Sequence, residues 1–152
     1  MITLPTITAK DVMTTDVASA KPDTSIAAIA NLLIKRRISS VPVVDDRRRV
    51  VGLVSEEQLV RPRQGERIAH RSWWLVLLTS PEAAAKDYLE SHCRQAKDVM
   101  SRDIMVVRDS MPLRRLIELL AMPRIKHLPV VREDRLVGIV SRVDLLRVLA
   151  RA

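Results

Sequence analysis

The chain has 152 residues, which suits one ordinary domain or two small domains that share a core. Hydrophobic residues make up 47% of it, which excludes a disordered chain, and its formal net charge of +8 favours anionic ligands. The single cysteine, Cys93, excludes an intrachain disulfide, and the longest apolar run, residues 73–78, is far shorter than the about 20 residues of a membrane span.

One sequence pattern occurs twice in the chain. The segment Lys10–Met13 returns as Lys97–Met100, and Ile38–Val44 returns at the same spacing as Ile125–Val131. A third segment, Val51–Ser55, returns one residue closer, because the charged turn before it is one residue shorter in the second copy. This internal repeat predicts two similar structural units.

Each copy predicts the element order β-α-β-β-α. A short extended run, 17–20 or 104–107, leads into a polar turn and then a helix. Asp23 or Thr24 and Ser110 are expected to cap these helices, and Pro112 suits a first-turn position. The apolar residues of the helices have the spacing of one buried face. They are Ile26, Ile29, Ala30, Leu33 and Ile34 in the first copy, and Leu113, Leu116, Ile117, Leu120 and Ala121 in the second.

The second half of each copy predicts a hairpin and a closing helix. Pro123 should first end the second copy's helix about one turn earlier than its counterpart. Two β-branched runs then flank a charged turn, 41–44 with 50–54 and 128–131 with 136–140, which is typical of a hairpin. Ser55 and Ser141 are expected to cap the last helices.

An insert separates the copies. The expected organisation is a first repeat at 1–60, a basic and partly helical insert at 61–95 and a second repeat at 96–152. The insert contains Trp73-Trp74 and a predicted helix at 83–92. An apolar pair of this kind is expected to pack the insert on the rest of the module or on a partner chain.

The repeated strand with Pro-Val-Val (42–44 and 129–131) and the Gly-x-x-Ser turn (52–55 and 138–141) resemble a tandem pair of cystathionine-β-synthase (CBS) domains. The insert resembles one found in some bacterial proteins of this family. The resemblance implies an α/β (α+β) fold, with two repeats packed around a pseudo-twofold axis. It also implies a regulatory module without catalytic residues, which binds AMP, ADP, ATP, S-adenosylmethionine or NAD in clefts between the repeats.

The turn before the last helix predicts the main binding site. It joins a strand to a helix N-terminus, where backbone N–H groups and the helix dipole favour phosphate. Gly138 permits close approach, Ser141 can cap the helix or donate to phosphate, and Arg142 adds a positive charge. The resemblance implies that Asp144 accepts hydrogen bonds from both ribose hydroxyls, for which a carboxylate has the paired oxygens.

The first copy departs from this pattern. Gln58 stands at the position of the ribose aspartate, and Glu56 stands where Arg142 does and would repel phosphate. We therefore expect a competent cleft in copy two and a weak, empty or differently selective cleft in copy one. The resemblance also implies base or phosphate contacts at further positions, which are Met105, Val106, Lys126, His127, Leu128 and Pro129 in copy two and Arg37, Ser39 and Ser40 in copy one.

Two other functions remain open from the residues alone. The basic character permits nucleic-acid binding, although the basic residues are dispersed and aromatic residues for base stacking make up only 2% of the chain. A CBS scaffold that dimerises without a ligand is also possible. The expected protein is a cytoplasmic homodimer with no obligatory cofactor or metal and no membrane span, whose adenosine ligand acts on an unknown regulated partner by population shift.

Overall fold

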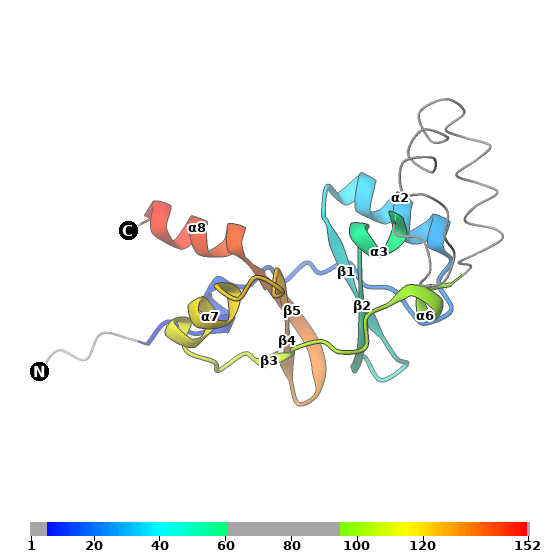
Figure 1. Ribbon diagram of the computed structural model, residues 1–152. Helices are drawn as coiled ribbons and strands as arrows, with labels where there is room; N and C mark the ends of the chain where they lie inside the picture. Colours follow the sequence, from blue (N-terminus) through cyan, green and yellow to red (C-terminus); the bar gives the residue numbers. More distant parts are fainter. Residues whose placement is uncertain (1–5, 61–94, 152) are drawn as a thin grey trace, which may run out of the picture.

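Two antiparallel hairpins stand at the centre of the computed structural model, which describes residues 6–60 and 95–151 (Figure 1). The first hairpin joins β1 (Ser40–Val44) to β2 (Val50–Ser55), and the second joins β4 (His127–Arg132) to β5 (Arg135–Ser141). Both hairpins were predicted and are confirmed. Their β-branched residues suit a pleated, buried surface, and Val41, Val43, Val130 and Val140 have no exposed surface.

The first strand of each repeat is shorter than predicted. In repeat 2 it is β3 (Val107–Arg108), which pairs in parallel with β4. In repeat 1 the run 17–20 makes a single parallel bridge, between Ala20 and Val43. Each repeat therefore supplies one full hairpin and, at most, a short third strand.

The central helices are α2 (Ile26–Arg36) and α7 (Leu113–Leu120). The second one ends about one turn earlier, as Pro123 predicted. The predicted caps are wrong: Ser25 caps α2 by accepting from the Ala28 N–H at 3.1 Å, because the helix begins one residue later. Pro112 is itself the N-cap residue of α7, and Ser110 makes no cap.

The predicted apolar faces are confirmed at their centres and wrong at their edges. Ile26, Ile29, Leu116 and Leu120 are buried, as predicted. Ile34, however, is 77% exposed, and Ile117 and Ala121 are also exposed. These positions lie at the margin of the helical face, where the adjoining sheet no longer covers them.

Two short helices exchange places between the repeats. Helix α1 (Ala9–Val12) opens repeat 1 in the sequence, but Ala9 packs in the core of repeat 2 with Leu116 and Leu128. Helix α6 (Ala96–Val99) opens repeat 2 in the sequence, but Ala96 packs in the core of repeat 1. Backbone bridges hold the exchange, with Thr14 paired to Ile139 and Ser101 paired to Leu53.

The last helices are α3 (Glu56–Val60) and α8 (Arg142–Arg151), which follow the two hairpins directly. They emerge on the same side of the hairpins as α2 (Figure 1). The Trp73-Trp74 pair, the predicted helix at 83–92 and Cys93 lie outside the described residues.

A cavity between the two repeats

A cavity of about 730 Å³ opens between the end of α2 and the start of α8. Its walls come from both repeats, since the segment after α1, the residues leading into β1, and the start of α8 all contribute. The lining residues are Thr14, Asp16, Val17, Ala18, Arg36, Arg37, Ile38, Ser39, Ser40, Pro42, Glu56, His127, Ile139, Ser141, Val143, Asp144 and Arg147. Its size and mixture of apolar and polar groups suit a small-molecule ligand.

Asp144 is the buried acid of this cavity, with only 4% of its surface exposed. Its Oδ2 accepts from the Ser141 N–H at 2.8 Å and from the Ser141 hydroxyl at 3.2 Å. Its Oδ1 accepts from the Thr14 hydroxyl at 3.0 Å and from Nη1 of Arg147 at 2.9 Å. A buried carboxylate requires such partners, and they hold it in one position at the cavity wall.

Gln58 performs the same local task in repeat 1. Its Oε1 accepts from the Ser55 N–H at 2.6 Å and from the Ser55 hydroxyl at 3.2 Å. Asp144 and Gln58 thus accept from the backbone N–H of the residue that precedes their helix in the same way. The prediction that the Ser55 and Ser141 side chains would be the capping acceptors is wrong, because both serines donate instead. The amide, however, brings no charge and only one acceptor oxygen.

His127 and two serines lie where the repeats meet. Nε2 of His127 and Oγ of Ser39 are 3.1 Å apart and share a hydrogen bond. Burial lowers the pKa of His127 below its usual 6.5, and nearby Lys126 lowers it further, while Asp144 and Glu56 act in the opposite direction. Ser40 is 4% exposed, and its hydroxyl has no hydrogen-bond partner among the described residues. A buried hydroxyl without a partner is uncommon in proteins, and this one lies on a residue that lines the cavity.

The structure brings together half of the predicted site residues. Those that line the cavity are Asp144, Ser141, His127, Arg37, Ser39 and Ser40. The other six predicted residues, Arg142, Lys126, Leu128, Pro129, Met105 and Val106, are not among its lining residues.

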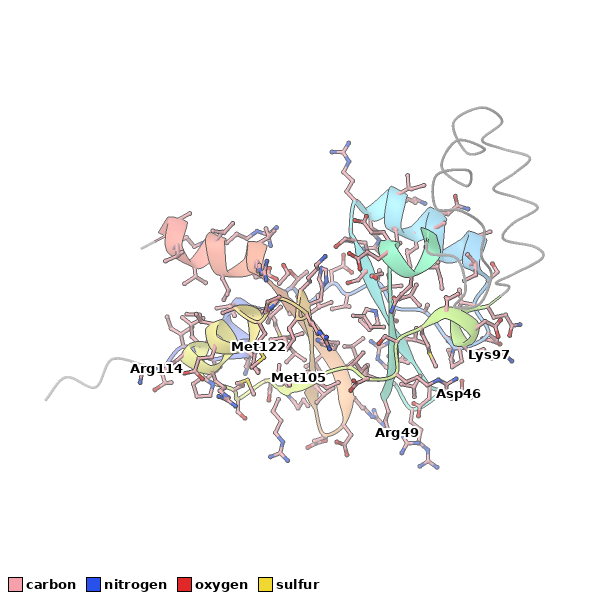
Figure 2. The ribbon with its side chains drawn as sticks, in the orientation of Figure 1. Asp46, Arg49, Lys97, Met105, Arg114 and Met122 are labelled. Atoms are coloured by element: carbon pink, nitrogen blue, oxygen red, sulfur yellow. The ribbon has the colours of Figure 1, made fainter. Side chains whose placement is uncertain are left out.

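These six residues have other positions. Nε of Arg142 donates to the Leu120 carbonyl at 3.0 Å, and Nζ of Lys126 pairs with Glu57 at 3.2 Å. Leu128 and Pro129 are buried in β4. Met105 lies on the connection into β3, away from α8 (Figure 2), and Val106 follows it. Ligand contact by any of these residues remains a prediction.

Several cavity residues were missed at the sequence level, notably Thr14, Val17, Ala18 and Arg147. Glu56 was assigned to the opposite cleft, but it lines the Asp144 cavity. The reason is the exchange of segments: a cleft between two repeats related by a pseudo-twofold axis takes its walls from both. The sequence did contain one signal of this exchange, the duplicated Lys-Asp-Val-Met segment. Its two copies show that each repeat includes a segment that precedes the strands of that repeat.

The fold and the jointly built cavity define a tandem-repeat module with a ligand-sized cleft between its halves. The family model of the CBS domain matches residues 9–64 and 96–151, so the chain belongs to the CBS domain family as a tandem pair.

Three similar proteins illustrate the range of the family. An uncharacterized protein of Methanocaldococcus jannaschii, MJ1426, is 28% identical over 142 residues, which cover 84% of this chain and 82% of that protein. The inosine-5'-monophosphate dehydrogenase of the same organism is 24% identical over 140 residues, but these cover 91% of this chain and only 23% of the enzyme. The crystal structure of CBSX2, a protein of Arabidopsis thaliana, in complex with AMP is 28% identical, with a TM-score of 0.71 over 95% of this chain and 96% of that chain.

Two features are absent from the described residues. Within residues 6–60 and 95–151, no helix combines the length and apolar character that crossing a membrane requires. The same residues contain no group of three or more histidine, cysteine, aspartate or glutamate side chains placed to hold a metal ion.

Proposed function

We propose that this chain is a cytoplasmic regulatory module that binds an adenosine-containing ligand in the Asp144 cavity and communicates its state to a partner protein. The observation that carries the proposal is Asp144 itself, a buried carboxylate on the wall of a cavity that both repeats build. Its two oxygens suit the adjacent hydroxyls of a ribose. The AMP complex of the similar protein CBSX2 supports an adenosine ligand.

The contacts of Asp144 suggest how binding changes the module. Thr14 belongs to repeat 1 in the sequence, whereas Ser141 and Arg147 come from repeat 2. A ribose that bonds to the carboxylate competes with Thr14 and Arg147 for the same Oδ1 atom. Binding would therefore exchange a contact between segments for contacts with the ligand, and would favour one arrangement of the repeats. A partner that recognises this arrangement would receive the signal.

The test is a calorimetric titration of the purified chain with AMP, ADP, ATP, NAD and S-adenosylmethionine. We expect at least one of these to bind, and Asp144→Ala to weaken its binding at least tenfold. Gln58→Ala is the matched control, because it removes the same N–H acceptor from the other repeat but lies outside the Asp144 cavity. Equal losses in the two variants would contradict the assignment to this cavity, and no binding by the unmodified chain would leave only a scaffold.

We also propose that the module forms a homodimer through α8. Val143, Leu146 and Leu149 are exposed along this helix, and Leu149 is 70% exposed. A second copy that packs against this apolar side would remove it from water, as in an isologous twofold contact. Light scattering should give twice the chain mass for the unmodified protein and the chain mass for Leu146→Glu. A monomeric unmodified protein at tens of micromolar would refute the dimer.

A further inference from the structure

The ionic side chains of the Asp144 cavity fall into two pairs and two single groups. Nη1 of Arg36 lies 3.1 Å from Oδ2 of Asp16, and Nη1 of Arg147 lies 2.9 Å from Oδ1 of Asp144. Arg37 and Glu56 also line the cavity, and neither forms a side-chain hydrogen bond or an ion pair within residues 6–60 and 95–151. Glu56 does act electrostatically on His127, but burial lowers the pKa of that histidine and so favours its neutral form. A ligand in the cavity therefore meets one carboxylate and one guanidinium that are not already neutralised by a neighbour.

The backbone fixes both single groups at this cavity. Glu56 is the first residue of α3, and its N–H donates to the Ser39 carbonyl at 2.9 Å. Arg37 ends α2 in the left-handed conformation, with φ of 53°, and its N–H donates to the Ile34 and Leu33 carbonyls. Glu56 is thus bonded through its backbone to Ser39, and Arg37 lies only two residues before Ser39. The start of α3 and the end of α2 therefore bring opposite charges to the same part of the cavity wall.

The sign of each charge discriminates between the possible 5′ groups of an adenosine ligand. A phosphate is attracted by Arg37 but repelled by Glu56, and so gains little from the pair. An uncharged 5′ group gains from neither. A group that carries both an ammonium and a carboxylate can pair with Glu56 and Arg37 together, and charge-assisted hydrogen bonds strengthen both contacts.

We propose that this cavity selects an adenosine ligand whose 5′ substituent ends in an amino-acid zwitterion, with Glu56 binding the ammonium and Arg37 binding the carboxylate. The proposal rests on the function proposed above, because it assumes that Asp144 holds the ribose. S-adenosylmethionine and S-adenosylhomocysteine share this chemistry, and they differ in the positive charge on sulfur. AMP and 5′-methylthioadenosine lack the zwitterion and serve as the comparison ligands.

The experiment is calorimetry of the full chain with these four compounds at low and moderate salt. We expect S-adenosylhomocysteine to bind at least about fivefold more tightly than AMP or 5′-methylthioadenosine, a modest ratio because both charged groups are exposed. Glu56→Gln should weaken S-adenosylhomocysteine several-fold and strengthen AMP. Arg37→Gln should weaken both of these ligands, and neither substitution should change the affinity of 5′-methylthioadenosine.

Matched controls separate this effect from a general change of charge. Glu57→Gln removes the adjacent carboxylate and Lys35→Gln removes a nearby cation, and neither residue lines the cavity. These two variants should keep the preference for S-adenosylhomocysteine over AMP. S-adenosylmethionine should respond to Glu56→Gln and Arg37→Gln as S-adenosylhomocysteine does, and a response of S-adenosylmethionine alone would mean that the sulfonium is recognised, which overturns the proposal.

Failure of this inference can be told apart from failure of the proposed function. If adenosine compounds bind and Asp144→Ala abolishes the binding, but AMP binds as tightly as S-adenosylhomocysteine, only the zwitterion proposal is overturned. The same conclusion follows if Glu56→Gln leaves the ratio of the two affinities unchanged. If neither these four compounds nor ADP, ATP and NAD bind to the unmodified chain, the adenosine site itself is refuted.

Discussion

The hydroxyl of Thr14 donates a 3.0 Å hydrogen bond to Oδ1 of Asp144, a residue 130 positions further along the chain. The two residues meet because the segment after α1 crosses to repeat 2 and pairs with β5 through the bridge between Thr14 and Ile139. The acid proposed to bind the ligand is therefore attached directly to the segment that leads into the other repeat. A ligand that engages Asp144 acts on the junction between the repeats.

This contact gives the first prediction. Thr14→Val keeps the shape of the side chain and removes its hydroxyl, so Oδ1 of the buried Asp144 loses one of its two donors. We expect the free energy of unfolding in urea to fall by about 1 kcal/mol, since Arg147 and Ser141 still satisfy the carboxylate. Ser101 occupies the equivalent position beside β2 and is the control, so a loss as large in Ser101→Ala would argue against a specific Thr14–Asp144 contribution.

The exchanged helices predict that damage to one end of the chain appears in the opposite repeat. Ala9→Asp places a carboxylate in the core around Leu116 and Leu128, at a cost of several kcal/mol. Hydrogen exchange should show lost protection in β4 and β5 before β1 and β2. Ala96→Asp should show the reverse order, because Ala96 packs in the core of repeat 1. Loss confined to the repeat nearest in sequence would contradict the exchange.

The glycines within β2 and β5, Gly52 and Gly138, predict a steric test. A Cβ on Gly52 would lie 2.5 Å from Sδ and 2.8 Å from Cγ of Met100, which is too close for carbon and sulfur atoms. Gly52→Ala should therefore destabilise the protein by about 1–3 kcal/mol, as overpacking does. Adding Met100→Ala should recover part of this loss, and the coupling in a double-mutant cycle measures it. A Cβ on Gly138 would meet Met13 in the same way. If the losses of stability in Gly52→Ala and Met100→Ala simply add in the double variant, no such contact limits residue 52.

His127 predicts a loss of stability on mild acidification. Burial, followed by Lys126, lowers its pKa below 6.5, while Asp144 and Glu56 oppose this shift. The unfolded chain then binds more protons than the folded chain below about pH 6.5, so stability is constant above that pH and falls as the pH decreases. Between pH 7.5 and 5.5 we expect a loss of at most about 1.4 kcal/mol from this residue.

The measurement is urea unfolding of the unmodified protein and of His127→Gln at both pH values. Glutamine retains a hydrogen-bonding group for Ser39 but does not titrate in this range. The stability of the variant should change less between pH 7.5 and 5.5 than that of the unmodified protein. An equal or larger change in the variant would show that His127 is not the group responsible.

The sequence alone predicted the hairpins and the central helices, but it made the first strands too long and did not predict the short helices α1 and α6. The hairpins and central helices follow from local patterns, since alternating β-branched residues and helical apolar spacing act over a few neighbours. The shorter second helix followed from Pro123, which acts on its own turn. The edges of the buried faces were different: Ile34 has the right spacing but lies beyond the reach of the sheet, a fact that depends on packing.

The tertiary structure decided which residues share a cavity. The sequence pointed to Asp144, Ser141 and His127, but it grouped them with Met105 and Lys126 from the same repeat. The chain instead exchanges α1 and α6 between the repeats, because Ala9 and Ala96 each fill the core of the opposite unit. That exchange brings Thr14 to Asp144, and the packing of the two repeats places Arg37 and Glu56 on the wall of the same cavity. No local pattern encodes it, because contacts between distant segments depend on the packing of the whole chain.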